Sequence, residues 1–188
     1  MSIEPRTPPS AGPLTLLALI LSWVAVVGSV FLTLGMGLTA CPLCFYQRAF
    51  ACAVAATLSV GVTTGMARTT ALSALTLPIC IAGLSVAGFH VWLEQSGKLE
   101  CPAGVAGLGS APTQSCAIFA LLTLVLLSEA WQDLRPGGGW SATLGSILLG
   151  VVLALLCIAS APRLNPAPEK PYEEAPRICR PPYVAPAE

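Results

Sequence analysis

Residues 14–38 read LTLLALILSWVAVVGSVFLTLGMGL, a stretch that contains no charged side chain. About 20 apolar residues are enough for an α-helix to cross the hydrocarbon of a bilayer. Lipid offers backbone groups no hydrogen-bond partners, so a segment of this length crosses as a helix that satisfies them internally. The stretch therefore predicts an all-α protein embedded in a membrane.

The composition of the whole chain supports this prediction. Of its 188 residues, 55% are hydrophobic and only 10% are charged, which is too little charge to cover a soluble domain of this size. The formal net charge is zero and the sequence contains no basic patch, so nucleic acid is not an expected partner. We expect membrane-spanning helices at residues 14–38, 49–67, 69–93, 117–127 and 140–161.

The spans divide the chain into four parts. A short N-terminal cytoplasmic segment (1–13) is followed by a membrane domain (14–134), an additional helix (135–161) and a Pro-rich tail (162–188). The tail is predicted to be largely disordered. The fourth span is the shortest, and we expect its acidic end, with Glu129 and Asp133, to reach the membrane interface.

The distribution of Lys and Arg predicts how the chain is oriented. Five spans put Arg6, Arg68 and Arg135 on one side, which the positive-inside rule makes cytoplasmic. The loops with the cysteines, in which Lys98 is the only basic residue, then face outside. The tail would also lie outside, although it carries four basic residues that favour the cytoplasm: Arg163, Lys170, Arg177 and Arg180.

A motif with two cysteines follows the first span: CPLCFYQR, residues 41–48. Pro42 suits the first turn of a helix, and the dipole at a helix N-terminus stabilises a thiolate there. Cys44 and Arg48 lie one turn apart on one helix face, so Arg48 can stabilise a thiolate at Cys44 or an anion bound beside it. A charge this close to hydrocarbon indicates a functional residue, whereas Arg48 without the cysteines would suggest an anchor to lipid headgroups.

Cys101 and Cys116 form a second pair, which brackets a loop on the same side. Eight cysteines in a membrane protein, several of them near span ends, indicate thiol chemistry facing an oxidising compartment. A purely structural disulfide in this loop and a zinc site of four cysteines are the alternatives. Attachment of c-type haem is excluded, because Phe45 and not histidine follows the CxxC.

Two further residues have open roles. His90, the only histidine, is predicted at the outer end of the third span with Glu94 one turn on as a hydrogen-bond partner, and it is either structural or functional. Cys179 in the tail is an unpaired cysteine, an accessory exchange thiol or half of a disulfide, for which Cys157 is a candidate partner.

Together these motifs resemble the disulfide bond formation protein B (DsbB) family: CPLCFYQR after a first span, HVWLEQ (residues 90–95) at the end of a third, and a second external cysteine pair. The resemblance covers residues 14–134 and implies a four-helix membrane bundle, to which this chain adds a fifth helix and the tail. It also implies a thiol:quinone oxidoreductase of the bacterial inner membrane. Such an enzyme reoxidises a DsbA-like thioredoxin-fold dithiol oxidase and reduces a membrane quinone, ubiquinone or menaquinone.

The resemblance also assigns roles to individual residues. It makes Cys41, Cys44, Cys101 and Cys116 catalytic, with Cys101 meeting the partner and Cys116 passing the disulfide on to the CxxC. It implies Arg48, Cys44 and His90 as quinone-binding residues and no metal. Two alternatives remain: a vitamin K epoxide reductase-like enzyme, whose CxxC would be expected in a late helix, and a non-enzymatic membrane scaffold with structural disulfides or bound metal.

Overall fold

The computed structural model describes residues 11–66, 70–132, 139–162, 166, 168 and 170–184. Within them the chain forms five long α-helices and one short 3₁₀ turn, and no strand beyond two isolated β-bridges. The helices are α1 (Pro13–Leu34), α2 (Pro42–Thr63), α3 (Thr70–Gln95), α4 (Ala111–Gln132) and α5 (Gly139–Ser160), with η1 (Val105–Gly107) between α3 and α4. All five α-helices are long and apolar enough to cross a membrane. The protein is therefore a multi-pass, all-helical membrane protein.

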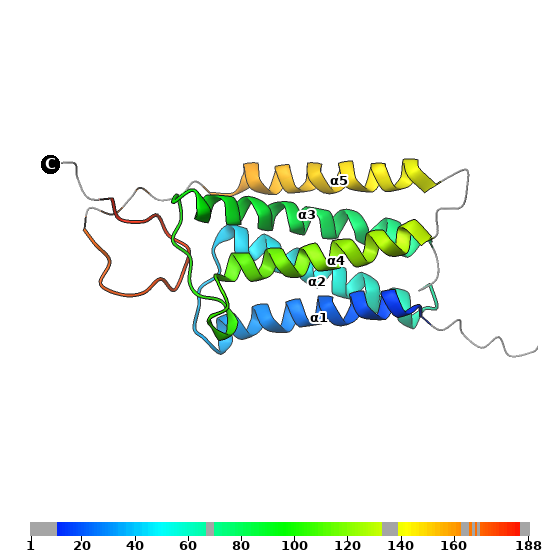
Figure 1. Cartoon of the computed structure of the whole chain (residues 1–188), viewed down its shortest axis with the longest axis horizontal. Coiled ribbons are helices and arrows are strands. Elements are labelled where there is room, and N and C mark those ends of the chain that lie inside the picture. Colours follow the sequence, from blue (N-terminus) through cyan, green and yellow to red (C-terminus); the bar gives the residue numbers. More distant parts are fainter. Residues whose placement is uncertain are drawn as a thin grey trace, which may run out of the picture.

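The first four helices form a bundle, and the fifth packs on its outside (Figure 1). In this bundle α1 contacts α2 and α4, and α3 contacts the same two helices. α5 packs against α3, which makes α3 the most buried of the five spans. The prediction of a four-helix core with an additional helix is confirmed.

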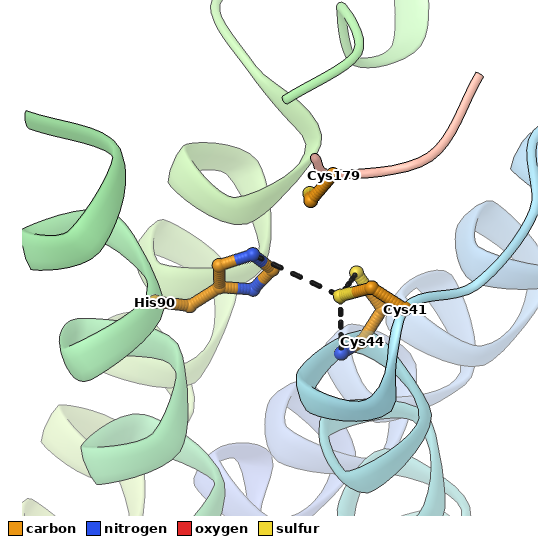
Figure 2. A group of neighbouring side chains, drawn as sticks. All are labelled: Cys41, Cys44, His90 and Cys179. Carbon is orange, nitrogen blue, oxygen red and sulfur yellow. Dashed lines mark hydrogen bonds between the residues drawn. The ribbon is translucent and has the colours of Figure 1, made fainter. Parts of the chain in front are cut away.

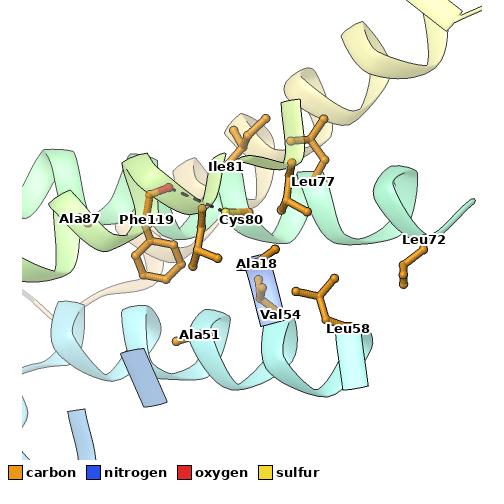
Figure 3. Packing of buried hydrophobic residues seen from close by; sticks show 12 residues of the cluster. Ala18, Ala51, Val54, Leu58, Leu72, Leu77, Cys80, Ile81, Ala87 and Phe119 are labelled. Carbon is orange, nitrogen blue, oxygen red and sulfur yellow. Dashed lines mark hydrogen bonds between the residues drawn. The ribbon is translucent and has the colours of Figure 1, made fainter. Parts of the chain in front are cut away.

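Glycines allow the helices to approach one another closely. A Cβ atom on Gly83 of α3 would overlap the ring of Phe119 in α4, which fills the space between the two helices. Figure 3 shows Phe119 among the apolar side chains of this core, beside Cys80 of α3. Within lipid, apolar burial gives little drive for helix association, so small residues that permit close packing hold such bundles together.

The contact of α5 with α3 depends on the same kind of packing. A Cβ atom on Gly150 would lie 2.7 Å from the carbonyl oxygen of Pro78, which stands inside α3. At the other end of α5, the Ser160 hydroxyl lies 3.2 Å from the hydroxyl of Tyr46 in α2. These contacts bring the end of α5 next to the first turns of α2.

The helix boundaries differ from the predicted spans at two places. α4 extends the short predicted segment 117–127 at both ends to 22 residues, so it is long enough to cross. Near its end, Glu129 accepts a hydrogen bond from Thr15 of α1, which gives an acidic side chain a polar partner within the bundle. α2 begins at Pro42 rather than residue 49, which places Cys44 inside a helix. Arg6, Arg68, Asp133, Arg135 and Arg163 lie outside the described residues.

The tail returns to the end of the bundle that carries the cysteine loops (Figure 1). Glu100, before α4, and Arg180 form an antiparallel bridge with N–H···O distances of 2.8 and 3.1 Å. The Thr39 backbone N–H, in the α1–α2 loop, donates to the carbonyl oxygen of Arg177 at 2.8 Å. Residues 170–184 are thus attached to both loops, which differs from the predicted disorder for this part of the tail.

Candidate functional site

Cys41 is the residue that caps α2. Its backbone is extended, Pro42 occupies the first helical position, and the Cys44 backbone N–H donates to the Cys41 sulfur at 3.2 Å. The first N–H groups of a helix have no partner within the helix. A sulfur that accepts a hydrogen bond from one of them lies at the positive end of the helix dipole, which stabilises its negative charge. The prediction that the CxxC stands at a helix N-terminus is confirmed, and Cys41, not Cys44, is the capping residue.

A group of four cysteine sulfurs, from Cys41, Cys44, Cys101 and Cys179, lies at this helix end and is called the sulfur group below; Figure 2 shows all but Cys101. Cys41 and Cys44 are free thiols with their sulfur atoms 2.8 Å apart. Cys101 forms a disulfide with Cys179 of the tail, across 78 positions of sequence. The expected pairing of Cys101 with Cys116 is therefore not the one found, and neither is a Cys157–Cys179 bond. The catalytic roles assigned to the four predicted cysteines stay predictions.

Cys116 lies apart from this group. It is a free, half-buried cysteine of α4 that packs against the core of the bundle. In the described part of the chain it makes no disulfide and no hydrogen bond through its sulfur. The α4 helix begins at Ala111, so Cys116 stands more than a turn inside it and not at the end of a flexible loop.

His90 is fully buried and faces the sulfur atoms from α3. Its Nε2 atom lies 3.5 Å from the Cys101 sulfur and 3.8 Å from the Cys41 sulfur. Its Nδ1 atom lies 3.1 Å from Nε2 of Gln47 in α2. An amide nitrogen only donates, so Nδ1 accepts and the neutral ring carries its proton on Nε2, toward the sulfurs. Glu94, the predicted partner of His90, instead accepts from the Ser110 hydroxyl at 2.6 Å.

The surroundings of Cys41 favour its thiolate. A hydrogen bond from the Cys44 thiol lowers the pKa of Cys41 to about 5, helped by His90 and the Cys44 backbone N–H and opposed by burial. A thiolate is the reactive form in disulfide exchange. The structure thus favours Cys41 as the nucleophile of the pair, a choice between the two cysteines that the sequence left open.

Arg48 is anchored to α1 by three hydrogen bonds. Its Nε donates to the Ser29 hydroxyl at 2.8 Å, and its Nη2 donates to the Ser29 carbonyl oxygen at 2.9 Å and to the Thr33 hydroxyl at 2.6 Å. Such contacts fix the plane of the guanidinium group. No hydrogen bond of Nη1 is found within the described residues, which leaves this donor for a ligand.

Cys44 and Arg48 line one cavity of about 460 Å³. Its walls come from α1, α2, α4 and both cysteine-side loops, and most of them are apolar, including Val24, Leu32, Val105, Leu108, Ile118 and Phe119. A mostly apolar cavity with a few polar groups is the usual form of a small-molecule site. Cys41 and His90 are not among the lining residues, so Cys44 stands between the cavity and the sulfur group.

A comparison with known families agrees with this geometry. The family model described as "Disulfide bond formation protein DsbB" matches residues 11–159. The chain belongs to the DsbB family. Membership makes it a disulfide-forming membrane oxidoreductase. It therefore favours neither a vitamin K epoxide reductase-like enzyme nor a non-enzymatic scaffold, the two alternatives that the sequence left open. The match ends before Cys179, so the DsbB family pattern does not include the tail. No curated protein and no solved structure matches the chain.

Sequence reasoning did not single out Gln47, although it stands inside the motif. Gln47 is buried, bonds to His90 and also lines the cavity. Its spacing from Cys44 could have indicated it, since residues three apart share a helix face. Ser29 and Thr33 carried no such signal, because their contact with Arg48 depends on how α1 is rotated against α2.

The sulfur group also contains donors that suit a metal ion. The ligand atoms of Cys41, Cys44, His90 and Cys179 lie within 4.8 Å of one another, and this set of soft ligands would suit zinc. In the structure, however, the Cys179 sulfur is bonded to Cys101. A disulfide sulfur is not a thiolate ligand, so metal binding would first require reduction of this bond.

Proposed function

We propose that the chain is a thiol:quinone oxidoreductase that reoxidises a thioredoxin-fold dithiol partner, such as a DsbA-like oxidase, and passes the electrons to a membrane quinone. One observation carries the proposal. The Cys41–Cys44 dithiol stands between a group of exchangeable sulfurs and an apolar cavity that contains an arginine donor. The dithiol can exchange disulfides with the sulfurs on one side, and a lipid-soluble electron acceptor can reach it from the cavity on the other side.

The residues of the cavity suit a quinone, either ubiquinone or menaquinone. Its apolar walls match a hydrophobic ring and the start of an isoprenoid chain, and the Nη1 donor of Arg48 suits a ring oxygen. A bound quinone would supply the two-electron acceptor that no side chain can provide. Arg48 is held in orientation by Ser29 and Thr33, so little ordering is required when it binds a ligand.

The thiols then divide the work between them. Cys41, with its stabilised thiolate, exchanges disulfides with the outer pair. Cys44, which lines the cavity, passes the electrons on to the ligand bound there. His90 holds a proton on Nε2 beside the sulfurs and can stabilise whichever of Cys41 and Cys101 is the thiolate.

We further propose that the protein lies in a bacterial inner membrane with the cysteine loops outside, because thiol oxidation belongs to an oxidising compartment. The tail brings Arg177 and Arg180 to this same end, against the positive-inside rule. Arg180 is partly neutralised there by Glu100, whose carboxylate lies 3.8 Å from Nε, and it covers the Tyr172 ring at 3.5 Å.

Quinone reduction by the purified chain tests the proposal. The full-length protein in detergent receives a reduced thioredoxin-fold dithiol protein and a short-chain ubiquinone or menaquinone, and the quinone absorbance is followed. We expect catalytic loss of the oxidised quinone. Absence of quinone reduction by the folded wild-type protein, with both quinones, would refute the proposal.

A matched pair of glycine variants tests whether the cavity is the site. A Cβ atom on Gly28 meets nothing within 4 Å, and Gly28 lines the cavity, so Gly28→Leu has room for its Cβ and occupies part of the cavity. We expect its apparent KM for quinone to rise by about tenfold or more, which corresponds to about 1.4 kcal/mol of lost binding. Gly145 of α5 has equally open surroundings but is exposed and remote from the cavity, so Gly145→Leu should keep the wild-type KM. Equal KM values for the two variants would place the quinone elsewhere.

A further inference from the structure

Cys179 lies beside the CxxC although the chain reaches it only after all five helices. Its sulfur is within 4.8 Å of the sulfurs of Cys41 and Cys44 and of a ring nitrogen of His90 (Figure 2). At such distances a thiolate needs only a small side-chain rotation to attack a neighbouring disulfide. The tail therefore brings a fourth sulfur to a site that the bundle supplies with three.

Contacts other than the disulfide also hold Cys179 there. On one side, Arg180 exchanges two backbone hydrogen bonds with Glu100. On the other side, the Arg177 carbonyl oxygen accepts from Thr39, two residues before Cys41. The Arg180 side chain also donates to the Glu174 carbonyl oxygen at 2.6 Å, which closes this segment of the tail on itself. Cys179 therefore stays near Cys41 when its bond to Cys101 opens.

Apolar packing joins the same part of the tail to the helix end. Cys179 and Cys101 pack against a cluster of buried residues that includes Cys41 and Leu43 of the motif and Ala154 of α5. α5 thus supplies part of the apolar surface against which Cys179 of the tail packs. Cys116, in contrast, packs against the other cluster, in the core of the bundle.

We propose that Cys179 is a redox-active cysteine of this enzyme, which pairs with Cys101 and exchanges disulfides directly with Cys41. The inference deepens the proposed function, since it names the residue that connects the outer disulfide to the CxxC. It assigns to a tail beyond the family match the position that the sequence resemblance gave to Cys116.

The exchange balances within the chain. The Cys41 thiolate attacks the Cys179 sulfur, so that a Cys41–Cys179 bond forms, the Cys101–Cys179 bond breaks and Cys101 leaves as a thiolate. The departing Cys101 thiolate takes up the proton of the Cys44 thiol, and the Cys44 sulfur attacks Cys41, which forms the Cys41–Cys44 bond and releases Cys179 as a thiolate. Two thiols have been oxidised and one disulfide reduced, with no other oxidant. During turnover the same steps run in reverse, from the Cys41–Cys44 disulfide to the outer pair.

His90 is placed to assist the departure of Cys101. Its Nε2 lies 3.5 Å from the Cys101 sulfur and 3.8 Å from the Cys41 sulfur, so one N–H faces both the leaving and the attacking atom. A single donor shared in this way stabilises negative charge at either end of the exchange. His90 therefore acts on the exchanging sulfurs directly, as a hydrogen-bond donor to whichever of the two carries the charge.

Disulfide mapping of a variant that cannot complete the exchange tests the proposal without any quinone. Cys44→Ala with Cys101→Ala removes the CxxC partner of Cys41 and the disulfide partner of Cys179, so that Cys179 competes for Cys41 with Cys116 and with Cys157, which packs against the same cluster as Cys179. The full-length double variant is purified in detergent, equilibrated with oxidised glutathione, alkylated and digested, and its linked peptides are identified by mass spectrometry. We expect the Cys41–Cys179 peptide as the dominant disulfide of Cys41. A dominant Cys41–Cys116 or Cys41–Cys157 peptide, or a folded variant in which Cys41 forms no disulfide with Cys179, overturns the proposal.

Disulfide mapping of the wild-type chain provides a test that does not depend on the folding of the double variant. The oxidised wild-type chain should yield a Cys101–Cys179 peptide, and Cys157→Ala, which removes a free cysteine packed against the same cluster, should give the same map. A Cys101–Cys116 peptide in the wild type, or zinc retained in stoichiometric amount through a Cys179 thiolate, also overturns the proposal. Because none of these measurements involves quinone, failure of the cavity test leaves their result unaffected, and the reverse also holds.

Discussion

Gln47 holds His90 by a contact of 3.1 Å between its Nε2 atom and Nδ1 of the imidazole ring. Both residues are buried, and they come from the two helices that meet beneath the sulfur group. Since the amide donates, the ring is fixed in the form that carries its proton on Nε2. The residue that sets the histidine tautomer thus belongs to the same motif as the cysteines that the histidine faces.

Gln47→Leu should slow the exchange between Cys41 and the outer disulfide. Leucine keeps the volume but removes the donor, so the ring loses its fixed tautomer and a buried nitrogen loses its partner. We expect a rate about tenfold lower, the effect of roughly one hydrogen bond. The rate is measured by quenching with an alkylating reagent after a reductant is added to the oxidised protein.

Ser96→Ala is the matched control for this prediction. The Ser96 hydroxyl bonds to the Leu93 carbonyl oxygen at the end of α3, so its removal costs a hydrogen bond on the same helix without affecting the ring. An unchanged exchange rate in Gln47→Leu, or an equal loss in both variants, would contradict the positioning role of the amide.

The reactivity of Cys41 should depend on pH with a midpoint near its pKa of about 5. Above this value the reduced protein holds Cys41 as a thiolate, and reactivity falls as the pH is lowered through 5, because the thiol form does not attack. The relative alkylation rate of Cys41, followed by peptide mass spectrometry between pH 4 and about 9, reports the midpoint.

Removal of Cys44 should move this midpoint upward. The hydrogen bond from the Cys44 thiol is the largest cause of the lowered pKa of Cys41, so Cys44→Ala should shift the reactivity profile toward that of an ordinary thiol. A profile already centred near pH 8.5 in the wild type would show that the capping position does not stabilise the thiolate.

Arg48→Lys should weaken quinone use more than it weakens the fold. Lysine has a single nitrogen and cannot both retain the bonds to Ser29 and Thr33 and present a donor to the cavity. We expect the apparent KM for quinone to rise by about tenfold, with protein yield and helix content close to the wild type. Thr33→Val, which removes one of the three anchoring bonds and leaves the guanidinium in place, should raise KM less. A wild-type KM in Arg48→Lys would identify Arg48 as a structural anchor only.

The helices of this fold could be predicted from the sequence, because lipid excludes charge and each span shows this as an apolar stretch. The ends of α4 could not be predicted as well. Ala111 to Ser115 are polar or small, and they join the helix through contacts of its first turn, such as the Thr113 N–H with the Ser110 hydroxyl at 3.4 Å. The start of α2 follows from Pro42 in the motif, whereas the apolar stretch alone begins only at residue 49, because the first turns of the helix consist of the motif itself.

Only part of the candidate site could be predicted from the sequence. The CxxC, Arg48 and His90 stand out by residue type, and the structure brings Cys41 and His90 together. The partner of Cys101 did not stand out, because disulfide connectivity is not encoded in spacing and depends here on where the tail returns. The resemblance also favoured Cys116, since the tail lies beyond the part of the chain that it covers.

The last prediction concerns the side of the membrane on which the tail lies. Because the tail is joined to both cysteine loops, Cys179 and these loops must share one side, and thiol oxidation favours the outside. A chain that keeps Cys179 as its only cysteine should therefore react with a membrane-impermeant maleimide in intact spheroplasts. In a cysteine-free chain, Met66→Cys, between α2 and α3 at the opposite end, should react only after lysis, and Ser96→Cys should react without it. The reverse pattern for all three variants would put the sulfur group in the cytoplasm, where a disulfide relay of this kind would face a reducing thiol pool.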